Sequence, residues 1–386
     1  PVVPATGESP YTADDVTIVV PCHRTSVDDA IRLPAGAIAV DDASPVPVDG
    51  ATIRLPRNLG PGGARNAGLG LVTTPLVAFV DTDVDLPDGW LDPLLPHFAD
   101  DRVALVAPRV RTPVTGGRLG AYEHERSPLD LGDEPARVRA GSRVAYVPAA
   151  AILCRVDALR TVGGFDESLR FGEDVDLVWR LDATGHRCRY EPASEVHHDP
   201  RPTWRAWARQ RVGYGSSAAP LARRHRGALA PLRMSGWSIA AWALAMLGTP
   251  AGVAAGVAVG TGSAAALVRK LPDVPASVAF RLAATGNLRA GDQLANAIRR
   301  AWWPLVVLAA APSRTARRVL VASLVAARSP IVAADDLAYS VGVWQGVLRE
   351  RTVAPLVPEI SSWPGRRTSP KPAGVPAPAA PDAAAR

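Results

Sequence analysis

Over the first two hundred residues, short apolar runs alternate with polar segments that have helical periodicity. This alternation predicts an α/β domain, in which helices cover a sheet of largely buried strands. The apolar runs predict strands at 16–20, 37–41, 52–55, 76–80, 103–107 and 144–153. The polar periodic segments predict helices at 63–71, 89–98, 157–162 and 174–184.

The pattern changes near residue 200. Residues 234–268 contain no ionisable side chain and are rich in Ala, Gly and Val. A single membrane-spanning helix needs about 20 apolar residues, so this stretch is long for one span and short for two. A break at 248–250 predicts a helical hairpin that dips into or barely crosses a membrane; a buried hairpin of a soluble domain is the alternative. The later apolar pieces at 302–311 and 319–327 are too short to span and indicate interfacial helices.

The charge distribution favours a membrane surface as partner and argues against nucleic acid. The net charge is +6, and no Asp or Glu occurs between Pro200 and Pro272. Eight arginines lie within 201–233. Because basic residues flank both ends of the apolar stretch, both ends are expected on the cytoplasmic side. We therefore expect the protein at the cytoplasmic face of a bacterial cell membrane.

The remaining composition completes the expected organisation. Cys22, Cys154 and Cys188 have spacings that suit neither a zinc site nor a disulfide framework, which favours a reducing compartment. The first residues lack the basic start and apolar run of a signal peptide. The predicted parts are a disordered N-terminus (1–15), the α/β domain (16–200), a basic helical linker (201–233), a helical membrane-associated region (234–350) and a disordered, Pro- and Ala-rich tail (364–386).

Polar residues follow the first two predicted strands. Pro21 ends the first strand, and Asp41 and Asp42 end the second. In a parallel α/β sheet, ligands bind beyond the carboxyl ends of the strands. Carboxylates there can accept hydrogen bonds from a nucleotide base or from ribose hydroxyls. Taken alone, however, these residues are also ordinary turn formers.

A glycine-rich segment runs from Asn58 through Gly60 to Arg65. Glycines let the backbone approach a phosphate closely, and the helix that follows offers free N–H groups to an anion. Arg65 could add a charge-assisted hydrogen bond. The segment is not a dinucleotide fingerprint, because Arg65 stands where the third glycine is required. A glycine-rich turn before a helix explains the segment equally well.

Asp81-Thr82-Asp83 directly follows the apolar run at 76–80. Two carboxylates at alternate positions at a strand end are well placed to hold Mg²⁺ or Mn²⁺, which prefer oxygen ligands and share them with substrate phosphates. Such an ion acts as a Lewis acid on a leaving diphosphate. The sequence therefore predicts a divalent metal site at Asp81 and Asp83.

Glu173-Asp174 opens a predicted helix, and His197-His198 follows about twenty residues later. Either carboxylate could cap the helix, or one could be the general base that takes a proton from an acceptor hydroxyl. The imidazoles could complete the metal shell or could be structural. Both interpretations stay open on these residues alone.

In this order, the motifs resemble glycosyltransferase family 2 over roughly residues 16–201. The resemblance implies a GT-A fold, a Rossmann-like nucleotide-diphospho-sugar transferase domain, and a metal-dependent inverting glycosyltransferase (hexosyltransferase) with a nucleotide-sugar donor. On the donor side, it implies that Asp41 and Asp42 contact the uridine and that Arg65 contacts the diphosphate. It implies that Asp83 ligates the metal, that Asp81 contacts the ribose or a metal-bound water, and that His197 is favoured over His198 as a further metal ligand. It implies Asp174 as the general base, with Glu173 as the alternative. Pro21, Asn58 and Gly60 belong to the implied donor site.

A narrower resemblance rests on four segments. Residues 127–132, 144–150, 172–181 and 214–221 are similar to the glycosyltransferases of the mycofactocin system. That family is understood to add a glucose chain to a redox cofactor made from a peptide. The likeness implies UDP-glucose as donor, a small peptide-derived acceptor (mycofactocin) and extension of the product as an oligosaccharide.

Several alternatives are weighed against these motifs. A dehydrogenase would need the missing glycine, and a glycosidase has no use for diphosphate-binding elements. A nucleotidyltransferase shares the sheet and metal, but the Glu173-Asp174 helix start is not expected there. A family 2 enzyme acting on a lipid-linked or cell-wall polysaccharide, by rhamnosyl or galactosyl transfer, is the main rival. A non-catalytic membrane-docking protein would be expected to lack the acidic set, yet Asp81, Asp83 and Asp174 are present.

Overall fold

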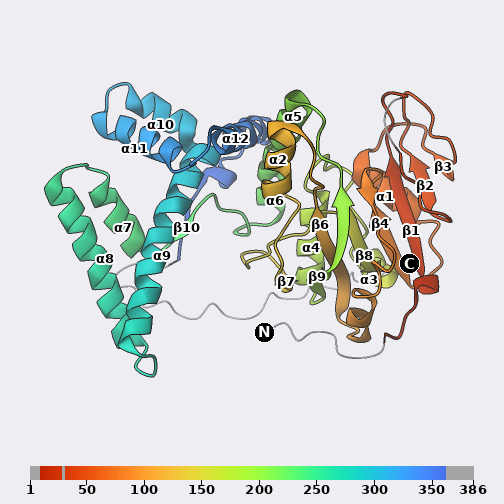
Figure 1. Cartoon of the computed structure of the whole chain (residues 1–386), viewed down its shortest axis with the longest axis horizontal. Helices are drawn as coiled ribbons and strands as arrows, with labels where there is room; N and C mark the ends of the chain where they lie inside the picture. The colour runs from red at the N-terminus through yellow and green to blue at the C-terminus, as the bar shows by residue number, and fades with distance from the viewer. Residues whose placement is uncertain (1–8, 28–30, 362–386) are drawn as a thin grey trace, which may run out of the picture. The chain divides into compact units, whose positions relative to one another are not determined.

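The computed structural model describes residues 9–27 and 31–361. Its contacts divide the chain into two compact units, shown in Figure 1: residues 1–232 with 293–358, and residues 233–292 with 359–386. All predicted site residues fall in the first unit, because they lie between Pro21 and His198.

The two segments predicted to be disordered lie largely outside the described residues. This holds for residues 1–8 of the N-terminus and for the tail at 364–386. Residues 9–15 are described, and they end in the 3₁₀ turn η1 (Ala13–Asp15), directly before the first strand.

The first unit is built on a mixed sheet. Its strands are β1 (Val16–Cys22), β2 (Ile38–Asp41), β3 (Ile53–Arg54), β4 (Leu76–Val80), β5 (Val84–Asp85), β6 (Val103–Arg111), β7 (Ala136–Val138), β8 (Ala151–Arg155) and β9 (Arg187–His198). The order along the sheet is β3-β2-β1-β4-β8-β6-β9-β5, with β7 beside β9. The strands β1 to β4 are parallel, whereas β8 is antiparallel to both β4 and β6. The α/β class predicted from the sequence is confirmed.

The core forms where helices cover this sheet. All five residues of β4 are buried, as expected for a central strand covered on both faces. Helix α1 (Gly60–Leu69) packs on β1 and β2, α3 (Val156–Thr161) on β8, and α4 (Glu173–Ala183) on β9. Phe79 of β4 meets Phe165 edge to face, with ring centroids 5.1 Å apart. This packing joins β4 to the segment that precedes α4.

The prediction of a helix at 89–98 is wrong. The structure has turns there and only a 3₁₀ helix, η2 (Leu95–Ala99). Pro93 and Pro96 lack the N–H donors that an α-helix needs in its interior, so regular i→i−4 bonding cannot propagate. The apolar residues of this segment nevertheless join the core, which is why its periodicity resembles a helix.

The strand predicted at 144–153 is shorter than expected. Strand β8 begins only at Ala151, and Val144 makes an isolated bridge to Val138. Pro148 interrupts the segment, because proline cannot donate to a strand ladder. The irregular residues before Ala151 therefore lie at the end of the sheet where α4 begins.

The first unit also contains a helical part. Its elements are α2 (Gly117–Arg126), α5 (Trp204–Ser216), α6 (Ala218–Arg224), the π-helical turn η3 (Ile298–Trp302), α10 (Trp303–Ala310), α11 (Arg314–Val325), α12 (Pro330–Glu350) and η4 (Ala354–Leu356). Helix α5 packs along α12. The approach is so close that a Cβ atom on Gly215 would lie 1.9 Å from the carbonyl oxygen of Tyr339.

These contacts give a domain division that differs from the predicted one. Residues 201–232, expected to be a linker, and residues 293–350, expected to be membrane-associated, both belong to the unit that carries the sheet. The physical reason is the glycine contact between α5 and α12, which joins segments more than a hundred residues apart. Composition alone does not reveal such a contact.

The second unit contains α7 (Gly236–Ala245), α8 (Pro250–Lys270), most of α9 (Ala276–Ala297), and the short pair β10 (Arg233–Met234) and β11 (Glu359–Ile360). Helices α7 and α8 form the predicted hairpin, with Thr249 accepting a hydrogen bond from the backbone N–H of Gly252 to cap α8. Asn287 of α9 accepts from the Ser238 hydroxyl at 2.7 Å. Within the described residues, α8 is the one helix long and apolar enough to cross a membrane.

Candidate active site

A buried arginine joins two of the predicted motifs. Arg65 of α1 is 3% exposed, and its Nη2 donates to Oδ1 of Asp81 at 2.7 Å. Its Nη1 donates to Oε1 of Glu173 at 2.8 Å. Asp81 follows β4 and Glu173 begins α4, so the end of the central strand and the start of the helix meet at one guanidinium. The two acidic motifs therefore form one site.

Burial shapes the charges of this cluster. Although burial alone would lower the pKa of Arg65, the charges of Asp81 and Glu173 raise it, so the guanidinium stays cationic. Burial raises the pKa of Glu173 to about 7, and the neighbouring charge of Asp174 adds to this rise against the opposing effect of Arg65. Glu173 can therefore change its protonation state near neutral pH.

Asp174 lies beside Glu173; as a residue it is partly exposed, whereas Glu173 is buried. Its Oδ1 accepts from the backbone N–H of Val175 at 2.7 Å, and its Oδ2 accepts from that of Ala149 at 3.3 Å. Burial raises the pKa of Asp174, while the Val175 N–H and the charge of Arg65 oppose that rise. A half-buried carboxylate with a raised pKa is suited to accept a proton from a hydroxyl group.

Gly172 sets the direction in which α4 starts. Its φ of +80° is in the left-handed region that favours glycine. A Cβ atom at this position would lie 2.9 Å from side-chain atoms of Leu221, in α6, and of Ser217, directly before α6. The sequence Gly172-Glu173-Asp174 is therefore constrained both by backbone conformation and by close packing.

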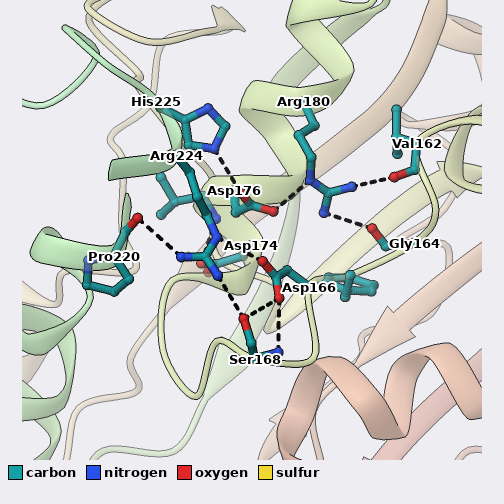
Figure 2. Close-up of polar contacts among 12 residues, drawn as sticks. Val162, Gly164, Asp166, Ser168, Asp174, Asp176, Arg180, Pro220, Arg224 and His225 are labelled. Atoms are coloured by element: carbon teal, nitrogen blue, oxygen red, sulfur yellow. Dashed lines mark hydrogen bonds and ion pairs between the residues drawn. The ribbon is translucent and has the colours of Figure 1, made fainter. Parts of the chain in front are cut away.

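Polar contacts hold α4 to the segments around it, as Figure 2 shows. The carboxylate of Asp176 accepts from Arg180 at 2.6 Å and from Nε2 of His225 at 2.8 Å. Arg180 also donates to the carbonyl oxygens of Val162 and Gly164. Burial opposes ionisation of Asp176, but the hydrogen bonds from His225 and Arg180 outweigh it and hold its pKa below the usual value. Asp176 is therefore a structural anion that holds α4 in place.

The second carboxylate of the Asp-Thr-Asp motif faces a histidine. Oδ2 of Asp83 lies 3.4 Å from Nε2 of His198 and 3.3 Å from Nη1 of Arg201. Strand pairing causes this approach, because Val84 stands opposite His198 in the β5–β9 ladder. His197 is instead 3.2 Å from Glu195, so the structure places His198, the less favoured of the two predicted ligands, next to Asp83.

The residues at Asp83 suit a metal that is shared with a substrate. In the part of the chain that the structure describes, no three His, Cys, Asp or Glu side chains converge as a metal cluster. A carboxylate and an imidazole arriving from two strands nevertheless match an ion that takes its other ligands from phosphates and water. Asp83, with His198 beside it, would be the residue to hold such an ion.

The two aspartates predicted to contact the uridine are both engaged within the protein. Asp41 is buried and accepts from Arg54 at 2.7 Å and from the backbone N–H of Ser44 at 2.8 Å. Although burial alone would raise the pKa of Asp41, hydrogen bonds from Ser44 outweigh it and lower the pKa. Asp42 accepts from the backbone N–H groups of Leu59 and Gly60, at 2.6 and 2.8 Å. Asp42 thus holds the glycine-rich segment against the end of β2.

Other predicted donor residues lie near this segment. Pro21 is half-buried in β1, opposite Val40. The side-chain nitrogen of Asn58 donates to the Asp42 carbonyl oxygen at 3.2 Å, and its Oδ1 accepts from Arg170. The structure therefore gathers the ends of β1 and β2 with the start of α1.

The diphosphate contact predicted for Arg65 does not match its position. Its guanidinium is buried and binds two carboxylates, so Arg65 holds Asp81 and Glu173 in position. Arg201, three residues beyond His198 and 3.3 Å from Asp83, was not among the predicted site residues. The signal for Arg201 was its place directly after the His197-His198 motif, but its charge was assigned to the basic linker.

Comparisons with known proteins identify the family of the chain. The family model described as "Glycosyl transferase family 2" matches residues 36–163. The pre-mycofactocin glycosyltransferase of Mycobacterium tuberculosis, in strains CDC 1551 / Oshkosh and H37Rv, is 43% identical over 387 aligned residues, which cover 90% of this chain and 82% of that protein. The uncharacterized glycosyltransferase YaiP of Escherichia coli K12 is 28% identical over 221 residues, covering 50% of this chain and 54% of that protein.

A solved structure is also similar to this chain. The mannosyltransferase PcManGT from Pyrobaculum calidifontis, in complex with GDP-Man and Mn²⁺, has 15% sequence identity and a TM-score of 0.48, with 90% of both chains covered. The family match, together with the mixed sheet and its covering helices, confirms the predicted GT-A fold.

Proposed function

Because the chain belongs to glycosyltransferase family 2, we propose that it transfers a hexose from a nucleotide sugar to a small peptide-derived acceptor, with inversion at the anomeric carbon. The proposed acceptor is a mycofactocin precursor, and the proposed donor is UDP-glucose. The 43% identity to the pre-mycofactocin glycosyltransferase over 90% of the chain supports this acceptor.

The observation that carries the proposal is the bridge from Asp81 through Arg65 to Glu173. A transferase must hold a donor sugar between a diphosphate site and a base that activates the acceptor. The bridge holds the end of β4, where we propose that the donor binds, at a fixed distance from the start of α4, where we propose that the base lies. Positioning of this kind is a large part of enzymatic rate enhancement.

We assign the general base to Asp174. As a partly exposed residue at the start of α4 it suits contact with an acceptor hydroxyl, and its raised pKa matches the proton that it must take. Glu173 is turned to Arg65, which suits a role in holding that guanidinium. A single base opposite the leaving group is sufficient for inversion, because no covalent sugar intermediate has to be formed.

On the donor side, Asp42 and Asn58 hold the segment that leads into Gly60, where the backbone could approach the nucleotide. Asp81 keeps its proposed place near the ribose, and Asp83 with His198 would hold Mg²⁺ or Mn²⁺. When bound, the ion would neutralise charge on the leaving diphosphate. Arg201, beside Asp83, adds a cation to the same region.

Mass spectrometry tests this function directly. The full chain is incubated with pre-mycofactocin, UDP-glucose and Mn²⁺, with one parallel reaction containing EDTA and another containing Asp83→Ala. We expect successive mass increments of one hexose each, lost both with EDTA and in the variant. Slow metal-dependent release of UDP without any increment would keep glycosyl transfer and overturn the proposed acceptor. Full activity in EDTA would overturn the metal role.

We further propose that the protein works at the cytoplasmic face of a membrane through the α7–α8 hairpin. Helix α8 has the length and apolarity of a span, it ends in Arg269 and Lys270, and two of its valines, Val253 and Val257, are exposed. Flotation with vesicles tests this: the full chain should float, and a chain lacking residues 234–268 should not. A full chain that stays soluble without detergent would make the hairpin a core element.

A further inference from the structure

A cavity of about 170 Å³ lies in the first unit, between α6, η3, α12 and the segment that follows α6. Much of its wall is apolar and includes Ala218, Leu229, Val343 and Pro355. An engineered cavity of about 150 Å³ is known to hold benzene, so this volume has room for one ring-sized group. None of its lining residues belongs to the predicted donor or metal set.

Arg300 is the charged group in the cavity wall. Its guanidinium stacks on the ring of Tyr339, 3.7 Å from the centroid, and its side chain is 35% exposed. Nη1 donates to Oδ1 of Asp336 at 3.2 Å, while the other oxygen of Asp336 accepts from Arg299 at 2.6 Å. Within the described residues, Nε and Nη2 of Arg300 make no hydrogen bond. A planar guanidinium with free donors is suited to a carboxylate or carbonyl oxygen.

The cavity lies next to the N-terminal end of α4, where the proposed general base lies. Helix α6 contributes Ala218 to the cavity wall, and its Leu221 lies against Gly172, the residue before Glu173. Burial raises the pKa of Tyr146 to about 12; the charge of Asp174 adds to this rise and that of Arg300 opposes it, so both charges act on one side chain. Arg300 also stands on a π-helical turn, a feature found often at functional sites.

We propose that this cavity is an acceptor subsite. It binds the part of the acceptor that is remote from the reacting hydroxyl, a ring-sized apolar group bearing a carboxylate or carbonyl oxygen that Arg300 holds. This inference rests on the proposed glycosyl transfer and adds to it the chemical class that the enzyme selects. The apolar wall takes the ring, and the stacked guanidinium fixes its orientation relative to Asp174.

Calorimetric binding tests the subsite separately from turnover. Pre-mycofactocin and UDP-glucose are titrated into the full-length wild type, Arg300→Met and Arg317→Met, the last being a control with an exposed arginine on α11. We expect Arg300→Met to weaken acceptor binding at least about tenfold, because it removes a charge-assisted hydrogen bond. Donor binding should be unchanged in both variants. Unchanged acceptor affinity in Arg300→Met would overturn the assignment of Arg300.

A second variant fills the cavity without touching a charge. Ala230 lines the cavity from the irregular segment after α6, so Ala230→Phe places a ring there with little demand on regular structure. We expect acceptor binding to be lost while the thermal unfolding midpoint and donor affinity stay as in the wild type. Retained acceptor binding in this variant, with the fold intact, would place the acceptor elsewhere.

A simpler probe separates failure of the subsite from failure of the proposed function. If the wild type does not bind pre-mycofactocin, the proposed acceptor is wrong, and benzoate and benzyl alcohol are titrated instead. The subsite predicts that benzoate binds more tightly than benzyl alcohol and that Arg300→Met removes the difference. Absence of benzoate binding in the wild type would overturn the subsite whatever the true acceptor is.

Discussion

Two arginines in the first unit are each buried between two carboxylates, yet their surroundings differ. Arg65 is 3% exposed and Arg211 is 2% exposed. The carboxylates around Arg65 come from a strand end and a helix start at the proposed active site. Those around Arg211 come from α2 and α12, which are packed around α5. The comparison sets a cluster at the proposed active site against one that joins three helices.

In the Arg211 cluster, each nitrogen of the guanidinium has a partner. Nε donates to Asp335 at 3.0 Å, Nη1 to Gln210 at 3.0 Å and Nη2 to Glu123 at 2.5 Å. The guanidinium also lies over the ring of Trp207, 5.5 Å from the centroid. Such complete pairing is what buried ions need if they are to be tolerated in a core.

The Arg65 cluster is incompletely paired. Nε of Arg65 is buried and has no hydrogen-bond partner among the described residues. Asp81 is 32% exposed, against 13% for Asp335. Glu173 has a pKa raised to about 7, chiefly by burial. Groups that keep unused hydrogen bonds and a near-neutral pKa can exchange partners or protons when a substrate binds, whereas the Arg211 cluster cannot do so without loss of stability.

The largest difference between the clusters is expected in catalysis. Asp174→Asn should lower transfer by about a hundred- to ten-thousand-fold, because the amide cannot accept the acceptor proton. Donor affinity should stay near the wild-type value. Asp335→Asn is the matched change in the structural cluster, and it should alter turnover of folded protein far less. Steady-state kinetics checks both variants, and a fully active Asp174→Asn would remove this residue as the base.

The next largest difference is expected in stability. Arg211→Met leaves two carboxylates buried without a cation, which costs about 3–5 kcal/mol of unfolding free energy. Arg65→Met should cost less, because Asp81 is partly solvated and Glu173 can take up a proton. Urea unfolding of the two variants measures the difference. Equal losses would show that the two clusters are equally structural.

The pH dependence of stability sharpens the comparison further. The pKa of Glu173 in the folded protein, about 7, lies above the usual 4.5, so the folded state binds more protons between these values. The contribution of Glu173 therefore becomes less favourable as the pH rises from about 4.5 to about 7. Removing the cation in Arg65→Met raises this pKa further and extends the loss to higher pH.

Glu173→Gln is the matched control for that pH effect. Unfolding midpoints are compared across the pH range for the wild type, Arg65→Met and Glu173→Gln. The difference between wild type and Glu173→Gln should vary through the window given above. A difference that does not change with pH would mean that Glu173 is ionised throughout and that its raised pKa is wrong.

The acidic motifs could be predicted from the sequence because each stands where a strand ends or a helix begins. The run at 76–80 gave both the buried β4 and the place of Asp81 and Asp83 at its end. The start of α4 at Glu173 followed from its acidic first turn and the apolar face behind it. These are local signals, readable within one turn or strand.

Contacts between distant segments could not be predicted in the same way. Arg65 and Glu173 are 108 positions apart, and no local pattern distinguishes an arginine that binds phosphate from one that binds two carboxylates. The choice of His198 over His197 depends on the β5–β9 register, and a shift of one residue reverses which side chain faces Asp83. The joining of residues 201–232 to the sheet depends on glycine contacts with α12.

The smallest expected effect is the loss of unfolding free energy in Tyr122→Phe, a variant of the Arg211 cluster. The hydroxyl of Tyr122 donates to Oδ2 of Asp335 at 2.7 Å, and the same carboxylate also accepts from Nε of Arg211. Tyr122→Phe removes one donor and leaves Asp335 with its charged partner, so it should cost only about 1 kcal/mol. Urea unfolding measures this loss. A loss comparable to that of Arg211→Met would mean that Asp335 relies on the hydroxyl as much as on the guanidinium, and the contrast between the two clusters would then lie in exposure rather than in pairing.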